Sequence, residues 1–106
     1  MGGSPLQRSG VDRVLDALSA HHRRLILLEL RAGRAEHVTD VLLREGDEDT
    51  ALLELEHNHL PRLTEAGYVE WDRETGALSR GPNFSEVAPV LALLEDHADE
   101  LPPDWP

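Results

Sequence analysis

The sequence predicts a small, mainly α-helical domain that carries one β-hairpin in its C-terminal half. Apolar residues recur every three or four positions over much of residues 11–66, which is typical of amphipathic helices. The apolar period changes to two around Tyr68, as in short strands, before a helical period returns. A length of 106 residues allows one domain with a modest core.

Two helices are expected in the first third of the chain. Ser9 begins a pattern that resembles a capping box, ahead of a short amphipathic helix over residues 11–18. Ser19 is expected to cap a second helix over residues 21–31, and Gly33 to end it. Because leucine and isoleucine cover most of its circumference, this second helix is predicted to be central and buried.

Two further helices are expected before the hairpin. A brief third helix covers residues 38–42, and Gly46 stops it. The acidic turn at residues 47–49 leads into a fourth helix over residues 50–66, with Gly67 as the residue that ends it. Acidic residues at a helix start cap it and complement its dipole, so they need no functional explanation.

The hairpin and a last helix complete the predicted elements. Strands are expected over residues 68–71 and 77–79, joined by a tight turn in which Gly76 takes the left-handed conformation. A last helix is expected over residues 85–100, in which Pro89 is tolerable only near the first turn.

The predicted order of elements is that of a winged helix-turn-helix domain, with the hairpin as the wing. Residues 11–81 would form this domain, and residues 82–101 a C-terminal helix that serves in dimerisation. Residues 1–10 are mostly turn-forming and predict a flexible arm, while residues 102–106 predict a disordered tail.

One stretch of sequence resembles a known family. Residues 57–69, HNHLPRLTEAGYV, resemble the end of the recognition helix in arsenic-repressor-type (ArsR-like) winged-helix regulators, which commonly show His-Leu, then Leu, then Glu-Ala-Gly. Residues 15–19 and 23–27 look like the first and second helices of that family. The His-x-His-Leu-Pro variant is similar to small winged-helix domains of halophilic archaea. The resemblance covers about residues 11–80 and implies sequence-specific DNA binding as a homodimer.

A helical wheel of the fourth helix divides it into a buried face and an outward face. Leu52, Leu55, His59 and Leu63 share the buried side at about 100° per residue. Candidate DNA contacts therefore come from the outward residues and from arginines of the hairpin. The full candidate set is Thr50, Glu54, His57, Asn58, Arg62, Arg73 and Arg80.

Each candidate has a chemical role in a DNA interface. Asn58 suits adenine and Glu54 suits a cytosine amine in the major groove, whereas the planar fork of Arg62 suits a phosphate. Arg73 and Arg80 suit a narrow minor groove. Against this, the outward face of a helix is polar by default, so simple solvation explains the same residues equally well. The fourth helix also departs from typical recognition helices, because it is acidic and contains Pro61.

Metal, cofactor and catalytic sites are not expected. The chain has no cysteine, and His57 and His59 lie on opposite sides of a helix, so His59 is predicted to be a packed, hydrogen-bonded residue. His97 and Glu100 form at best half of a zinc site. No nucleophile elbow, phosphate loop or HExxH motif is present, so the chain is not predicted to be an enzyme.

Composition points to a protein of high-salt surroundings. The formal charge is −11, and all ten basic residues are arginine, with no lysine. An acidic surface resists association where salt screens charges strongly, which favours a halophile. A GC-rich genome explains the arginine bias alone but not the excess of acids. No apolar run is long enough to span a membrane, so a cytoplasmic location is expected.

Two hypotheses on partners remain open from the sequence. The first is a DNA-binding homodimer that associates through the first and last helices. The alternative is a protein-interaction module on the same scaffold, which the acidic fourth helix favours. The residues predicted to form the dimer contact are Val14, Val87, Val90, Leu91, Leu94 and Ala98. Arg23 and Arg24 are predicted either to contact phosphates or to pair with nearby acids.

Overall fold

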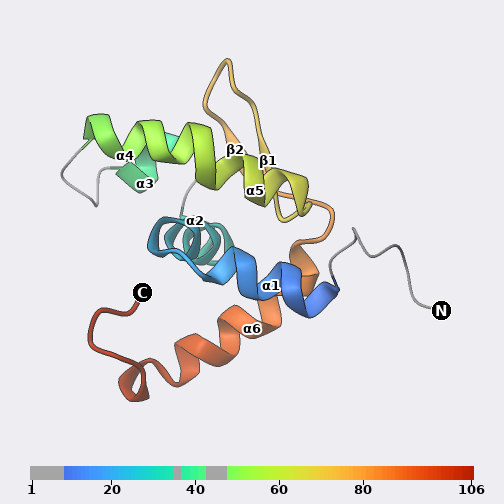
Figure 1. Cartoon of the computed structure of the whole chain (residues 1–106), viewed down its shortest axis with the longest axis vertical. Helices are drawn as coiled ribbons and strands as arrows, with labels where there is room; N and C mark the ends of the chain where they lie inside the picture. Colours follow the sequence, from blue (N-terminus) through green and yellow to red (C-terminus); the bar gives the residue numbers. More distant parts are fainter. Residues whose placement is uncertain (1–8, 35–36, 43–47) are drawn as a thin grey trace.

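The computed structural model of the chain describes residues 9–34, 37–42 and 48–106. It is mainly helical, with one two-stranded antiparallel sheet, as predicted (Figure 1). In chain order the elements are α1 (Gly10–Leu18), α2 (His21–Ala32), α3 (Val38–Leu42), α4 (Glu48–Glu54), the π-helical turn η1 (Leu55–His59), α5 (Leu60–Glu65), β1 (Val69–Trp71), β2 (Leu78–Arg80), α6 (Phe84–Asp96) and the 3₁₀ turn η2 (Ala98–Glu100).

The ends of α1 and α2 follow local signals, with one correction. The Ser9 hydroxyl accepts a hydrogen bond from the Asp12 amide at 3.1 Å, so the predicted N-cap of α1 is confirmed. Gly33 ends α2 in the left-handed conformation at φ 74°, also as predicted. The prediction for Ser19 is wrong: Ala20 is the N-cap of α2, and Ser19 ends α1 by donating to the carbonyl of Asp16 at 2.7 Å.

The predicted fourth helix is continuous from α4 to α5, but its middle is a wider turn. In η1 the backbone bonds reach five residues back, and the Leu60 amide donates to the Leu55 carbonyl. The sequence reason is Pro61, whose ring in a regular helix would clash with the carbonyl four residues earlier. Pro61 instead lies at the start of α5, where an amide hydrogen is not needed. Gly67 then ends the helix at φ 80°.

The hairpin pairs Val69 with Arg80 and Trp71 with Leu78. Its turn is closed by the Asp72 carboxylate, which accepts from the Glu74 amide at 2.9 Å. Gly76 has a φ of 81°, as the turn type requires. An isolated bridge between His37 and Ala77 attaches the hairpin to the start of α3.

The C-terminal part differs from its prediction in two ways. The last helix is shorter than residues 85–100, because α6 ends at Asp96 and η2 follows. Pro89 lies inside α6, beyond the first turn, on the exposed side of the helix. The predicted disordered tail is also wrong: Trp105 packs against the core. Its neighbour Pro106 accepts hydrogen bonds on its main-chain oxygen from α2.

The core is built around α2. Figure 1 shows α4, η1 and α5 on one side of α2, α6 on the other side, and the hairpin projecting away from α6. Three residues predicted to form a dimer contact, Val14, Val87 and Leu91, are instead buried in this core. Of the others, Val90 and Leu94 are half-buried, and Ala98 is exposed. Within the described residues, no helix has the length and apolar character needed to cross a bilayer.

Candidate nucleic-acid interface

The candidate surface combines the outer face of the α4–α5 rod with the hairpin tip. We define the outer face as Thr50, Glu54, His57, Asn58 and Arg62. Asn58 is half-buried and the other four residues are exposed. The opposite side of the rod supplies Leu55 and Leu63 to the core, so the buried face predicted from the helical wheel is confirmed for these two residues, and Leu60 is buried beside them.

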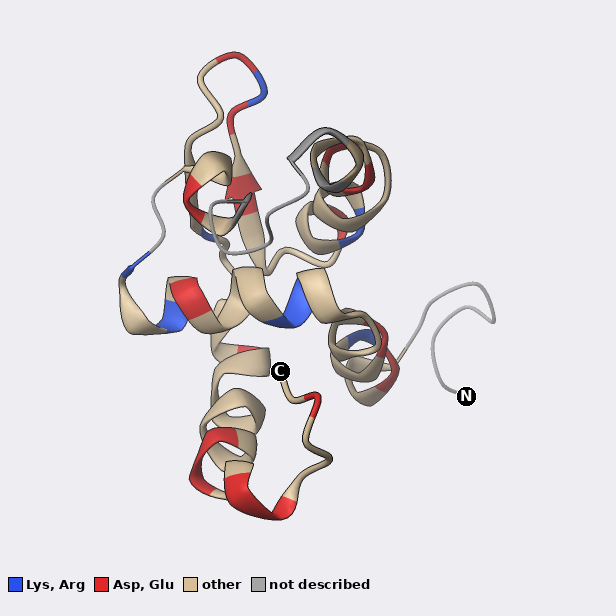
Figure 2. Ribbon diagram, turned by 90° about the vertical axis from the view of Figure 1, so that its left-hand side faces the viewer, with Lys and Arg blue, Asp and Glu red and all other residues tan. Residues whose placement is uncertain are grey.

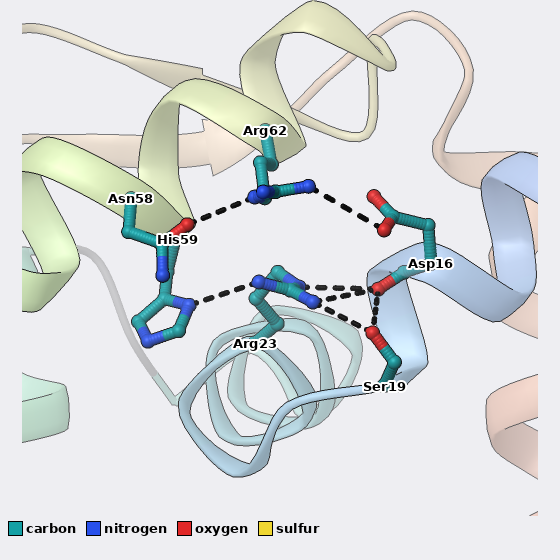
Figure 3. Close-up of polar contacts among 6 residues, drawn as sticks. All are labelled: Asp16, Ser19, Arg23, Asn58, His59 and Arg62. Atoms are coloured by element: carbon teal, nitrogen blue, oxygen red, sulfur yellow. Dashed lines mark hydrogen bonds and ion pairs between the residues drawn. The ribbon is translucent and has the colours of Figure 1, made fainter.

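A chain of polar contacts runs along the outer face. Asn58 donates from Nδ2 to Glu54 Oε2 at 3.3 Å, and its Oδ1 accepts from Arg62 Nε at 2.8 Å. These pairs are four residues apart, the spacing at which helical side chains meet. Arg62 also reaches Asp16 of α1, with 3.5 Å between Nη1 and Oδ1 (Figure 3). The Asn58 amide is therefore fixed in orientation, and Arg62 already has a carboxylate partner.

Beneath the outer face, Arg23 of α2 is almost completely buried, with 5 % of its surface exposed. Its guanidinium donates to the main-chain oxygen of Asp16 at 2.9 and 3.2 Å and to the Ser19 hydroxyl at 2.7 Å. Its Nη1 lies 3.0 Å from Nδ1 of His59 (Figure 3). The prediction of Arg23 as a phosphate contact is wrong, because these internal acceptors occupy its donors. The prediction of His59 as a packed, hydrogen-bonded histidine is confirmed.

Arg24 has an internal role as well. It donates from Nη1 to the Leu18 carbonyl at 2.7 Å and from Nε to the main-chain oxygen of Pro106 at 2.9 Å. Its guanidinium lies 5.9 Å from the centre of the Trp105 ring. It therefore joins the end of α1 to the C-terminal tail and is not a phosphate contact. No local pattern indicates the contact with the tail, because Trp105 and Pro106 lie at the far end of the sequence from Arg24.

The hairpin tip carries one exposed arginine among acidic residues. Arg73 stacks on Trp71, with 4.6 Å between the guanidinium carbon and the ring centre. The exposed acids Glu70, Asp72 and Glu74 surround it, and Figure 2 shows the mixed charge at this tip. A groove next to the hairpin is lined by Thr64, Gly67, Trp71, Arg73 and Pro82, among others.

Arg80 does not belong to this surface. It donates from Nε to the Leu30 carbonyl at 3.1 Å and from Nη2 to the Arg31 carbonyl at 2.7 Å. Both carbonyls belong to the last turn of α2, and that of Leu30 also accepts from the Gly33 amide at 3.2 Å. The guanidinium also lies 5.0 Å from the centre of the Phe84 ring. The prediction of Arg80 as a DNA contact is therefore corrected to a cap on the C-terminal end of α2.

The surface as a whole is acidic. On the rod, Glu54, Glu56 and Glu65 outnumber Arg62, and at the hairpin three acids outnumber Arg73. Elsewhere, Nδ1 of His97 and Oε2 of Glu100 lie 2.7 Å apart and share a hydrogen bond. Over residues 9–34, 37–42 and 48–106, no three potential ligands gather in a metal-binding arrangement.

No protein-family model matches the chain, nor does any curated protein or solved structure. Its chemistry must be inferred from its own residues. The outer face offers one oriented amide, two hydrogen-bonding groups on Thr50 and His57, and the guanidinium of Arg62, and the hairpin tip adds that of Arg73. Such donors and acceptors bind the edges of bases or the polar groups of a protein surface.

Proposed function

We propose that the chain is a winged helix-turn-helix regulator that binds duplex DNA. In this proposal α3 and the α4–α5 rod form the helix-turn-helix, and the hairpin is the wing. The observation that carries it is the pairing of an exposed polar outer face with an exposed arginine at the tip of an adjacent hairpin. The rod would lie in the major groove while Arg73 approaches the minor groove or the backbone.

The polar chain on the outer face supports a specific role for Asn58. Its Oδ1 accepts a hydrogen bond from Arg62 and its Nδ2 donates one to Glu54, so the amide is oriented before any ligand binds. An amide that presents both an acceptor and a donor matches N6 and N7 of adenine. Arg62 would exchange Asp16 for a phosphate oxygen, since the guanidinium fork suits either group.

Net charge places a condition on this function. A protein of formal charge −11 is repelled by DNA in dilute buffer. At about 1 M salt the Debye length is about 3 Å, so only groups in direct contact still interact strongly. We therefore expect binding in concentrated KCl, as in the cytoplasm of a halophile, with a weak or inverted dependence on salt. Conventional binding would weaken steeply as salt is raised.

The test is fluorescence anisotropy with labelled duplexes from the promoter upstream of the gene for this chain, between about 0.1 M and several molar KCl. Asn58→Ala should weaken binding to the preferred duplex by roughly tenfold or more, the usual effect of losing a bidentate base contact. Arg73→Ala should weaken all duplexes alike. Arg31→Ala, which removes an arginine that pairs with Glu95, is the matched control and should change nothing.

A dimer would suit a palindromic site, and the structure changes the residues proposed for its contact. Val11, Leu15 and Leu93 are 67 %, 59 % and 59 % exposed, and α1 packs against α6. We propose that these side chains form the contact, in place of the buried Val14, Val87 and Leu91. Leu15→Asp should then give monomers in light scattering at high salt, whereas an unchanged dimer would point to another surface.

One observation favours the alternative, a protein-interaction module. Leu53 lies on α4 and is 58 % exposed, which adds an apolar side chain to an acidic surface. If no duplex binds at any KCl concentration, the DNA proposal fails. A protein partner whose binding is lost in both Leu53→Ser and Asn58→Ala would then establish the alternative.

A further inference from the structure

The buried contact between Arg23 and His59 constrains the protonation of the histidine. A guanidinium carries only donors and stays charged in proteins, so Nδ1 of His59 has to accept the hydrogen bond. A histidine that accepts at Nδ1 is neutral and holds its proton on Nε2. Arg23 and His59 are only 5 % and 7 % exposed, so water cannot readily replace either partner.

Further ionisable groups surround the pair. The His22 ring stacks on His59, with 5.4 Å between ring centres and 28° between planes, and His21 contacts His22 edge-on at 5.3 Å. Burial is the main cause that lowers the pKa of His59 from its ordinary value of 6.5, followed by the charges of Arg23 and His22. The ionisable residues of the neighbouring elements that act on this pair are His22 and Arg24 of α2, Asp16 of α1, Glu54 of α4 and Arg62 of α5.

We infer that the Arg23–His59 contact is a proton-sensitive link between α2 and the α4–α5 rod. A proton that binds Nδ1 of His59 turns the acceptor into a donor and adds a second positive charge beside Arg23. The hydrogen bond is then lost and the two groups repel each other. Arg23 keeps its bonds to Asp16 and Ser19, so His59 and η1 are the part that moves away.

The position of His59 gives this change a route to the outer face. His59 is the last residue of η1, a π turn of the kind that occurs mostly as a single turn within a helix, frequently at functional sites. Asn58 precedes it directly, and Arg62 follows three residues later, so movement of η1 displaces the amide and guanidinium of the polar chain. The link itself does not depend on DNA, but an effect on DNA affinity rests on the proposed function.

The direction of the pH effect follows from linkage. The folded state holds His59 neutral more strongly than the unfolded state does, so its contribution to stability is present above about pH 6.5. As the pH falls below that value the unfolded chain binds a proton first, and the contribution is lost progressively. Unfolding of the native chain should therefore become easier between neutral pH and the lower pKa of folded His59.

The first test is ¹⁵N NMR of the histidine rings in the intact chain at high KCl. We expect His59 to show the Nε2–H tautomer at neutral pH and to titrate below 6.5. The amides of η1 and of the first turn of α5 should change with the same midpoint. A proton on Nδ1 at neutral pH, or titration of His59 at or above 6.5, would overturn the inference. So would titration without any change in these amides.

The second test uses His59→Asn, whose Oδ1 stands in for Nδ1 and cannot be protonated. The free energy of unfolding, measured with denaturant, should depend less steeply on pH in this variant than in the native chain. The difference in slope corresponds to the uptake of up to about one proton. His57→Asn is the matched control, since it replaces an exposed imidazole two residues away, and it should keep the native slope. An unaltered slope in a folded His59→Asn variant contradicts the inference. If that variant does not fold, the NMR result on the native chain decides the question.

DNA binding separates this inference from the proposed function. If the chain binds duplex, acidification should weaken binding in the native chain and in His97→Asn, which changes an exposed imidazole outside the proposed interface, but much less in His59→Asn. If no duplex binds at any pH while NMR shows the expected tautomer and shifts, the proposed function fails and the proton-sensitive link stands. If binding weakens equally in all three proteins and NMR shows no change at His59, the proposed function stands and the proton-sensitive link fails.

Discussion

Tyr68 shows how one buried polar group is satisfied at the junction of three segments. It is fully buried, and its hydroxyl donates to Glu86 Oε1 of α6 at 2.7 Å. Arg13 of α1 donates to the other oxygen of the same carboxylate at 3.2 Å. The two hydrogen bonds, with Tyr68 first, lower the pKa of Glu86. The cluster therefore fixes α1 and α6 against the start of the hairpin.

The single tyrosine makes this cluster measurable. Burial is the main cause that raises the pKa of Tyr68 to about 12, and the bond to Glu86 adds to it. Absorbance of tyrosinate in the native chain should therefore rise near pH 12, compared with about 10 in denaturant. Since the folded pKa is the higher one, this stabilisation is complete below about pH 10 and is lost as the pH rises toward 12. A midpoint near 10 in the folded protein would show that Tyr68 is accessible to water.

At the scale of elements, the π turn decides which leucines enter the core. Leu55 and Leu60 are five residues apart, which on a regular helix places them about 140° from each other. The wider turn brings both onto the buried side, where each is fully buried. Regular helical spacing put Leu60 only at the edge of that face, so the sequence predicted the helix but not its local winding.

This difference predicts unequal costs for two leucines of the same rod. Leu60→Ala should lower the free energy of unfolding by about 2–5 kcal/mol, because it leaves a cavity in the core. Leu53→Ala removes an exposed side chain and should change it by no more than about 0.5 kcal/mol. Urea denaturation at constant high salt measures both. Similar costs would mean that the rod is wound as a regular helix with another face inward.

At the scale of the whole molecule, the C-terminal tail closes one side of the fold. Trp105 packs against the core near Leu18 and Leu94. Arg24 and His21 both bind the main-chain oxygen of Pro106, at 2.9 and 3.0 Å. The proline-rich composition correctly predicted that no helix continues here. It did not indicate that the tail would pack, because the contacts of Trp105 and Pro106 named above are with residues of α1, α2 and α6, far away in the sequence.

Release of the tail can be followed by tryptophan fluorescence. In a Trp71→Phe background only Trp105 remains, since the chain has two tryptophans. Arg24→Ala removes the hydrogen bond to Pro106, so Trp105 should become more accessible to acrylamide and emit at longer wavelength. Arg31→Ala is the control, because its side chain pairs with Glu95 and lies outside the tail contact. Equal quenching in all variants would show that the bond from His21 and the packing of Trp105 hold the tail without Arg24.

The sequence by itself determined the start of α1, the ends of α2 and α5, and the turn of the hairpin. The residues that set these positions act through the backbone of their immediate neighbours: Ser9, Gly33, Gly67 and Gly76. The spacing of apolar residues likewise indicates which side of each helical turn is buried. These effects are local, so they can be read without a structure. The buried side of the fourth helix, including His59, was predicted on the same basis.

Only the tertiary structure decided what the arginines do. Arg23 meets His59 across 36 residues, Arg80 meets Leu30 across 50, and Arg24 meets Pro106 across 82. A guanidinium on a long flexible side chain bonds to the acceptors that packing brings within its reach, and those acceptors come near it only when the chain has folded. The same holds for Val14, Val87 and Leu91, which were predicted at a dimer surface and lie in the core. A stripe of apolar residues predicts that a helix face is covered, but not whether another part of the chain or a second protomer covers it.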